Sequence, residues 1–391
     1  MKPLEGLTVL DLSRVLACPF ASMILAELGA QVIKVEQPGS GDETRGFEPQ
    51  LAKDSAYYFA CNRSKASITV NLRSAAGQGV VRDLAQQADV LVENFPVGTL
   101  ARYALDFATL SGLNPRLVYV SCTGFGQTGP YAPRKGYDTV FQAMGGLMSL
   151  TGEKGGGPVK PGLPVADLTS GLWVAVGILA MLAGREKTRR GAYLDFSMLD
   201  GQVSLLTLAA ARYFALGEVP PRLGTEHPGR VPSATFRCKD GRFAHITASD
   251  QHWKPLCDAL GLSFDLDLST NEKRVEHRDR IMDSLSRRIL AMQRHELLSR
   301  LDAAGVPVGP VNDVAEVLAD PHVRARGLVG SFDYPGVGEF RALGLPYRFL
   351  GWDDPQIGAP PPLGADTDRI LAEKLGYPEE RIRKLRSEKA I

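Results

Sequence analysis

Asp167 is the residue of this sequence with the clearest chemical potential. It ends a segment rich in glycine and proline, residues 155–167, and directly precedes an apolar run over residues 168–184 that predicts a helix. A carboxylate at the start of a helix lies in the positive field of the helix dipole, with its oxygens directed away from the helix. Two roles fit such a group. It caps the helix through the amides of Thr169 and Ser170, or it acts as a nucleophile.

The first half of the chain predicts the scaffold that would position this residue. Short apolar runs at residues 7–13, 31–36, 67–72, 90–95 and 117–122 alternate with helical patterns such as those around residues 19–28 and 75–88. This alternation is typical of βαβ units, so we predict an α/β fold with a parallel sheet. Ligands bind beyond the carboxyl ends of the strands in such sheets. The segments at those ends are residues 13–15, 36–39, 94–96 and 123–126.

The pattern changes after about residue 220. Two alternating runs within residues 233–248 are joined by Lys239, Asp240 and Gly241, which predicts a β-hairpin. Helical segments follow near residues 250–260, 276–291 and 294–304. We therefore predict a large domain over residues 1–220, a smaller α+β domain over 225–315, and a return to the large domain over 320–391.

Composition excludes several classes of protein. The net charge of +1 gives no general attraction to nucleic acid. The five scattered cysteines indicate free thiols in a reducing compartment, and the N-terminus lacks the apolar stretch of a signal peptide. The apolar run after Asp167 is short for a bilayer span and predicts a buried core helix. We expect a cytoplasmic protein with no membrane or nucleic-acid partner.

No motif calls for a bound cofactor. The sequence has no phosphate-binding loop of the G-x-x-x-x-G-K-[ST] type and no G-x-S-x-G nucleophile elbow. The six histidines show no metal-ligand spacing. We therefore predict no metal and no tightly bound cofactor.

Five segments taken together resemble the class III CoA-transferase family. They are residues 1–19, 28–42, 89–95, 121–131 and 166–171, in this order and spacing. The family includes formyl-CoA:oxalate, carnitine and succinyl-CoA:dicarboxylate CoA-transferases, and also α-methylacyl-CoA racemase. The resemblance implies a Rossmann-like large domain with a parallel sheet, a smaller inserted α+β domain and an interlocked homodimer.

The resemblance also implies a mechanism. Asp167 would attack the thioester of an acyl-CoA such as succinyl-CoA, giving a mixed anhydride and then an aspartyl-CoA thioester. A free carboxylic acid would then take the CoA. We expect the helix N-terminus to keep Asp167 ionised. Coenzyme A is thus a substrate here, in its thioester form.

The CoA contacts implied by the resemblance are of three kinds. Val15 and Ala17 would lie at the thioester, Asn94, Phe95 and Tyr137 near the pantetheine, and Val70, Arg73, Arg102 and Lys135 at the adenine and phosphates. The three cations suit phosphate groups.

Departures from the family pattern bear on the acceptor. Leu16 stands where formyl-CoA transferases have glutamine, Asp138 where they have glutamate, and Gln37 where an arginine is frequent. His227 and Arg230, in a loop of the smaller domain, would bind the distal carboxylate of a dicarboxylic acceptor. Structural roles fit these two residues equally well.

Two other functions compete with that of a transferase. A racemase needs a catalytic His-Asp pair at residues 137–138, and this chain has Tyr137, whose ordinary pKa of about 10 makes it a poor base. A CoA-binding protein without turnover would not require Asp167. The sequence therefore favours a transferase.

Overall fold

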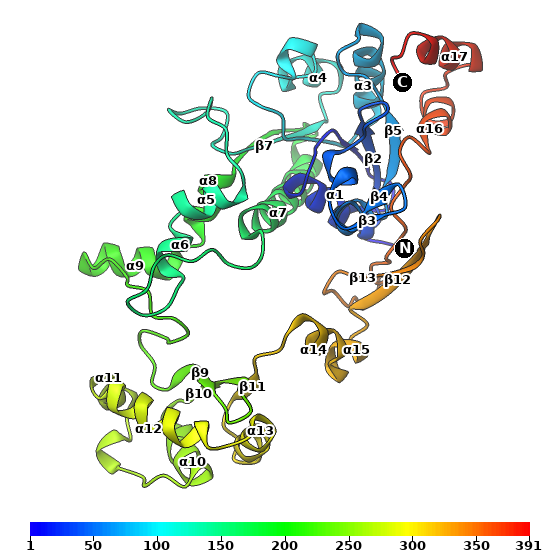
Figure 1. Ribbon diagram of the computed structural model, residues 1–391. Coiled ribbons are helices and arrows are strands. Elements are labelled where there is room, and N and C mark those ends of the chain that lie inside the picture. Colours follow the sequence, from blue (N-terminus) through cyan, green and yellow to red (C-terminus); the bar gives the residue numbers. More distant parts are fainter. The chain divides into compact units, whose positions relative to one another are not determined.

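The computed structural model describes residues 1–391 and contains a six-stranded parallel sheet. The strands lie in the order β5-β2-β1-β6-β7-β8, and Figure 1 labels β2, β5 and β7 of this sheet. Their bounds are β1 (Thr8–Asp11), β2 (Gln31–Glu36), β5 (Ala66–Thr69), β6 (Val90–Glu93), β7 (Val118–Thr123) and β8 (Tyr193–Ser197). The predicted α/β class with a parallel sheet is confirmed.

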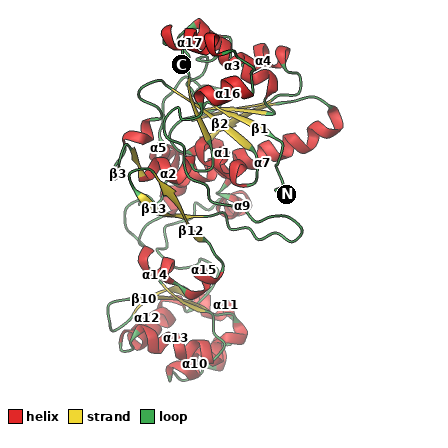
Figure 2. Ribbon diagram, turned by 90° about the vertical axis from the view of Figure 1, so that its right-hand side faces the viewer, coloured by secondary structure: helices red, strands yellow, loops and turns green.

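Side-chain alternation along the strands separates two buried layers. Leu10, Ile33 and Leu91 pack with helices α3 (Ala75–Gln87), α4 (Phe107–Leu113), α16 (Thr367–Glu373) and α17 (Glu379–Ser387). Val9 and Val90 project to the other face and pack with α1 (Ala17–Glu27) and α7 (Val165–Thr188). Figure 2 shows these two groups of helices on opposite faces of the sheet. Because helices cover both faces, the strands carry buried apolar side chains on both sides of the sheet.

The direction of the strand order reverses beside β1. The chain runs from β1 to β2 and β5 on one side, then continues through β6, β7 and β8 on the other. The loops after β1 and β6 therefore leave in opposite directions, which opens a crevice at the carboxyl ends of these strands.

Helix α7 differs from the predicted buried core helix. It has 24 residues, and 33% of its apolar stretch is buried. Val174, Ala175 and Ile178 pack in the core, whereas Leu172, Trp173 and Val176 are exposed. It is the one helix long and apolar enough to cross a membrane. A single helix of this kind is weak evidence, because core helices of globular proteins pass the same test.

A second compact unit contains the antiparallel sheet β11-β10-β9, formed by β9 (Ser233–Arg237), β10 (Phe243–Thr247) and β11 (Val308–Pro310). The predicted hairpin is confirmed, since His245 of β10 pairs with Thr235 of β9. Helices α10 (Asp250–Leu260), α11 (Asn271–Glu276), α12 (Arg278–Leu290) and α13 (Arg294–Ala303) belong to the same unit, which has its own apolar core.

The two units are discontinuous in sequence. The first comprises residues 1–147, 160–210 and 322–391, and the second 148–159 and 211–321. The predicted boundary at residue 220 therefore differs from the structure, and residues 148–159 belong to the second unit. Arg222 holds this segment by donating to the carbonyls of Ser149 and Gly156, and Lys154 pairs with Asp279.

The remaining elements are short: β3 (Gln50–Leu51), β4 (Asp54–Ser55), α2 (Ala56–Asn62), α5 (Asp138–Met144), α6 (Leu147–Leu150), α8 (Met198–Ser204), α9 (Thr207–Leu216), α14 (Val314–Ala319), α15 (Pro321–Ala325), β12 (Val329–Tyr334) and β13 (Gly338–Leu343).

Candidate active site

Asp167 lies in the first turn of α7, as its third residue, and does not cap the helix. The capping position is Pro164, and the Thr169 hydroxyl donates to the carbonyl of Val165 at 2.6 Å. The predicted capping role through Thr169 and Ser170 is therefore wrong, because a group in the third helical position cannot reach the amides that follow it. No hydrogen bond engages the Asp167 carboxyl group, which leaves its oxygens available for chemistry.

The start of α7 is held by a second carboxylate. The backbone N–H of Asp167 donates to Oδ1 of Asp138 at 3.1 Å, and Nε2 of Gln142 donates to Oδ2 of Asp138 at 2.5 Å. Asp138 and Gln142 both lie on α5, and Gln142 is fully buried. Asp138, for which the sequence indicated an acceptor contact, thus fixes the backbone of the candidate nucleophile.

Burial and the nearby carboxylate of Asp138 raise the pKa of Asp167 from 3.8 to about 7. A helix N-terminus lowers the pKa of a carboxyl group by less than about one unit, which is too little to offset this rise. The expectation that the helix keeps Asp167 ionised is therefore wrong. Near pH 7 this carboxyl group is about half protonated.

Three buried polar atoms under the first turn of α7 have no partner: Gln142 Oε1, Gln202 Oε1 and Ser170 Oγ. Gln202, on α8, also donates through Nε2 to the Thr169 hydroxyl at 3.0 Å. An acceptor and a hydroxyl left unpaired in a buried region are available for a substrate or a water molecule. Motif reasoning did not find the two glutamines. Gln142 follows Asp138 by one helical turn, which is a local signal, whereas Gln202 follows no predicted site residue at that spacing.

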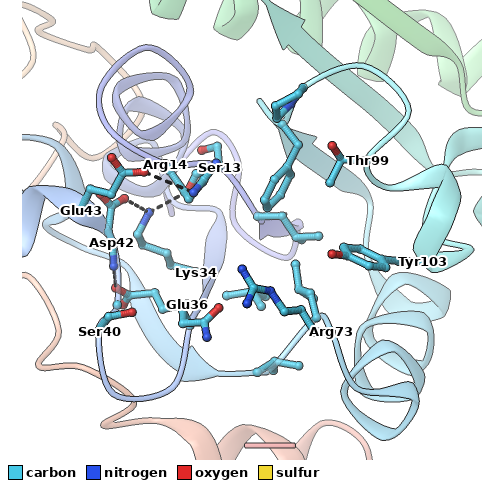
Figure 3. Close-up of a pocket in the computed structure, with 18 residues that line it drawn as sticks. Ser13, Arg14, Lys34, Glu36, Ser40, Asp42, Glu43, Arg73, Thr99 and Tyr103 are labelled. Carbon is cyan, nitrogen blue, oxygen red and sulfur yellow. Dashed lines mark hydrogen bonds and ion pairs between the residues drawn. The ribbon is translucent and has the colours of Figure 1, made fainter.

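A cavity of about 540 Å³ lies at the carboxyl ends of β1, β2, β5 and β6 (Figure 3). Of the predicted CoA-binding residues, Val70, Arg73 and Phe95 line it. Gln37 also lines it, at the position where an arginine is frequent in the family. The cavity therefore lies at three of the four predicted strand ends, those at residues 13–15, 36–39 and 94–96, and residues 123–126 do not line it.

Arg14 is a cation in this cavity that the predicted CoA contacts omitted. Its guanidinium lies 4.9 Å from the centre of the Phe95 ring and forms an ion pair of 3.2 Å with Glu43. Its Nε is buried without a hydrogen bond. Arg14 lies in one of the predicted strand-end segments, residues 13–15, and that position was the signal from which it could have been found.

Asn94 does not line the cavity. Its side-chain amide pairs with the backbone of Arg14, accepting from the N–H at 2.9 Å and donating to the carbonyl at 2.7 Å. The Asn94 side chain thus holds the loop after β1, and its contact with pantetheine stays a prediction.

The other predicted residues lie outside the cavity. Arg102 is exposed, next to the cavity residue Thr99. Lys135 and Tyr137 are exposed in the loop before α5, and the Tyr137 side chain is 80% accessible. Their contact with CoA stays a prediction.

Val15, Leu16 and Ala17 lie where the loop after β1 enters α1. Leu16 is the N-cap of α1, without a side-chain cap. A Cβ added to Gly171 of α7 would lie 2.6 Å from the carbonyl oxygen of Ala17, so the two helices meet in backbone contact. Gly171 follows Asp167 by one turn of α7. The thioester end predicted at Val15 and Ala17 therefore lies against the helix that carries Asp167.

His227 and Arg230 lie in the second unit, and both are exposed. The ring Nδ1 of His227 accepts the N–H of Gly229 at 3.0 Å, and Arg278 donates to the His227 carbonyl. These contacts shape the loop. Binding of an acceptor carboxylate by His227 and Arg230 stays a prediction.

Comparison with known proteins places the chain in a family. The family model for CoA-transferase family III matches residues 4–367. The chain is 39% identical to mouse (Mus musculus) succinyl-CoA:glutarate CoA-transferase over 389 residues, which cover 98% of this chain and 89% of that protein. It is 36% identical to the acetyl-CoA:oxalate CoA-transferase of Acetobacter aceti over 384 residues, with 96% and 97% covered.

A solved structure leads to the same assignment. The crystal structure of a CaiB/BaiF family protein from Brucella suis matches with a TM-score of 0.86 and 40% identity, covering 95% of this chain and 99% of that one. The resemblance of the five sequence segments is thereby confirmed. The chain belongs to CoA-transferase family III and is an enzyme of that class.

Proposed function

We propose that this enzyme transfers CoA from succinyl-CoA or a similar acyl-CoA to a free dicarboxylate, with glutarate as the first candidate acceptor. The single observation that carries this proposal is the carboxyl group of Asp167. It makes no hydrogen bond and is partly buried at the start of α7, while its backbone is fixed by Asp138. The relatives that act on glutarate and oxalate support a free carboxylate as acceptor.

The proposed reaction needs no net proton transfer. A carboxylate oxygen of Asp167 attacks the thioester carbon, the C–S bond breaks, and a mixed anhydride and CoA thiolate form. The thiolate then attacks the Asp167 carbonyl of the anhydride, which releases the donor acid and leaves an aspartyl-CoA thioester. The acceptor carboxylate repeats these steps in reverse. Only ionised Asp167 can begin the sequence, so the raised pKa of Asp167 limits the rate at acidic pH.

CoA would be held by local cations, because the chain as a whole is nearly neutral. Arg73 and Arg14 lie in the cavity at the strand ends, and Arg102 lies beside it. A planar guanidinium pairs well with phosphate oxygens. We propose that the CoA phosphates occupy this cavity and that the pantetheine runs toward the first turn of α7.

We further propose that two copies of the chain associate. The exposed apolar side chains Leu172, Trp173 and Val176 on α7 would be covered by the second copy rather than by a membrane, in a cytoplasmic homodimer. Light scattering coupled to size-exclusion chromatography tests this assignment. A monomer at micromolar concentration would contradict it.

Trapping of the covalent intermediate tests the mechanism. The protein is incubated with succinyl-CoA and then hydroxylamine, which converts an aspartyl thioester into a hydroxamate that peptide mass spectrometry locates. We expect the modification on Asp167 in the wild type and its loss in Asp167→Ala. Asp200→Ala is the matched control, because Asp200 is the third residue of α8, as Asp167 is of α7, and is exposed.

An acceptor screen completes the test. Formation of the new acyl-CoA is followed by mass spectrometry with glutarate, malate, mesaconate and oxalate as acceptors. Modification of Asp167 without turnover of any dicarboxylate would contradict the acceptor class alone. Absence of modification with succinyl-CoA and a panel of other acyl-CoAs would contradict the mechanism, and exchange of the α-proton in deuterated water would then test the racemase alternative.

A further inference from the structure

The loop between β1 and α1 contains a strained residue. Val15 has a φ of 69°, in the left-handed region that a β-branched residue rarely adopts. No glycine relieves the strain, so neighbouring groups must hold this backbone in place. The loop connects the cavity at the strand ends with the first turn of α1.

Ser13, Arg14 and Val15 are each held through their backbone groups, and Figure 3 shows Lys34 between Ser13 and Asp42. Ser13 donates its N–H to Asp11 at 2.9 Å, and its carbonyl accepts from Lys34 Nζ at 3.0 Å. The side-chain amide of Asn94 pairs with both backbone groups of the next residue, as described above. The N–H of Val15 donates to both carboxylate oxygens of Asp42, each at 3.3 Å.

Lys34 and Asp42 form a buried ion pair with an N–O distance of 2.8 Å, and their side chains are 1% and 0% exposed. Asp42 is fully engaged, because it also accepts from the N–H and the hydroxyl of Thr44. A buried ion pair contributes little net stability relative to apolar residues of similar size, since desolvation offsets the attraction. Its presence here is better explained by what it positions.

The loop has neighbours on both sides of the site. On one side Arg14 projects over the Phe95 ring in the cavity. On the other side Ala17 contacts the backbone of α7 at Gly171, one turn after Asp167. A change in the backbone at Val15 therefore moves the cavity wall and the support of α7 together.

We propose that the Lys34–Asp42 pair is a positioning device that locks Val15 in its left-handed conformation, and that Asp42 is a positioning residue for the transfer reaction. This inference rests on the proposed function for its kinetic part. It assigns a role to the segment over residues 28–42, in which Lys34 lies on β2 and Asp42 lies in the loop that follows this strand.

Asp42→Asn is the first test, because it removes the charge and keeps the shape. Val15 then relaxes out of the left-handed region, and we expect kcat to fall about 5- to 30-fold, the factor that corresponds to the strain at one such residue. Hydrogen–deuterium exchange of peptides spanning residues 13–18 should accelerate. If Asp42→Asn does not fold, Lys34→Met/Asp42→Asn replaces it, since that variant has no unpaired buried charge.

Val15→Gly provides the rescue, because glycine adopts a φ near 69° without strain. We expect Val15→Gly/Asp42→Asn to regain about fivefold in kcat over Asp42→Asn. The matched control is Asp54→Asn, which disrupts another buried ion pair, with Arg45, and contacts no residue of the loop. It should lower Tm and leave kcat within about twofold of the wild type.

Two results would overturn the proposal. One is an Asp42→Asn variant that behaves like Asp54→Asn, with a lower Tm but unchanged exchange and kcat. The other is a failure of Val15→Gly to restore turnover. The exchange measurement requires no turnover. An inactive wild type would therefore count against the proposed function, while the exchange rates would still decide whether Asp42 holds the loop.

Discussion

Replacement of Asp138 by asparagine should shift the pH dependence of kcat/KM. The pKa of Asp167 rises from 3.8 to about 7, mainly through burial and secondarily through the Asp138 carboxylate. As the smaller of two causes, Asp138 accounts for less than half of this rise. Removal of its charge should therefore lower the pKa of Asp167 by roughly one unit, to about 6.

The structure indicates that Asp138→Asn is tolerated. The new amide oxygen can still accept the N–H of Asp167. The new NH2 group faces Gln142, whose Oε1 has no partner and accepts it after a flip of the Gln142 amide. The substitution thus changes charge while the first turn of α7 keeps its hydrogen bond.

The expected pH profiles of the two enzymes cross. At pH 5.5 the ionised fraction of Asp167 rises about eightfold when its pKa falls from about 7 to about 6. Each ionised carboxylate becomes about 2.5-fold less reactive, if nucleophilicity follows a Brønsted coefficient of ~0.4, as for thiolates. The variant should therefore be about threefold faster at pH 5.5 and about 2.5-fold slower at pH 9.

The assay is initial-rate succinyl-CoA:glutarate transfer from pH 5 to 9.5, with kcat/KM read as a property of the free enzyme. Glu93→Gln is the control, because burial also raises the pKa of Glu93 to about 7. Its profile should keep the acidic limb near pH 7. A uniform loss of rate in Asp138→Asn at every pH would refute the electrostatic coupling between Asp138 and Asp167. A shift of the acidic limb of the kcat/KM profile in Glu93→Gln would refute the assignment of that limb to Asp167.

Three further predictions concern charge. The pKa of Glu93 is raised from 4.5 to about 7, so the folded state loses stability as pH rises through this range. Glu93→Gln should therefore raise the free energy of unfolding, measured by urea titration, by ~1–3 kcal/mol at pH 8 and leave it unchanged at pH 4. Burial of Asp11 is outweighed by Lys65 and Lys34, which lower its pKa to about 2, so Asp11→Asn should cost ~3–5 kcal/mol at pH 7 and less as pH falls from 3.8 toward 2. Equal costs at pH 7 and pH 2.5 would contradict this. Arg73→Ala should raise KM for acyl-CoA about tenfold with kcat within twofold of the wild type. High salt should reduce the difference in KM between the two enzymes. A loss confined to kcat would exclude phosphate binding by Arg73.

The sequence predicted the elements that follow from periodicity. The alternation of apolar runs and helical patterns gave the parallel sheet, and the strand ends gave the cavity. Asp167 itself was found from a local signal, a carboxylate between a glycine-rich segment and an apolar helix. These features depend on neighbours in sequence, so one chain is enough to predict them.

The chemistry of Asp167 could not be predicted in the same way. Its pKa depends on burial and on Asp138, which lies 29 residues earlier in the chain. The helix dipole, which lowers the pKa of Asp167, was the one electrostatic effect visible from the sequence. Burial and the Asp138 carboxylate together raise this pKa by more than the dipole lowers it. The role of Asn94 in holding the loop after β1 was missed for a similar reason, because its partner Arg14 lies 80 residues away.

The loop over residues 13–17 changes how the predicted contacts are understood. Resemblance assigned Val15 and Ala17 to the thioester end of the substrate, and the structure adds that both lie in one strained segment between the cavity and α7. Substitutions that release this segment should therefore change KM and kcat together, because one backbone movement reaches both places. Substitution of Arg73 acts on the cavity alone and should change KM. The ratio of the two effects thus distinguishes a residue that binds CoA from one that positions the site.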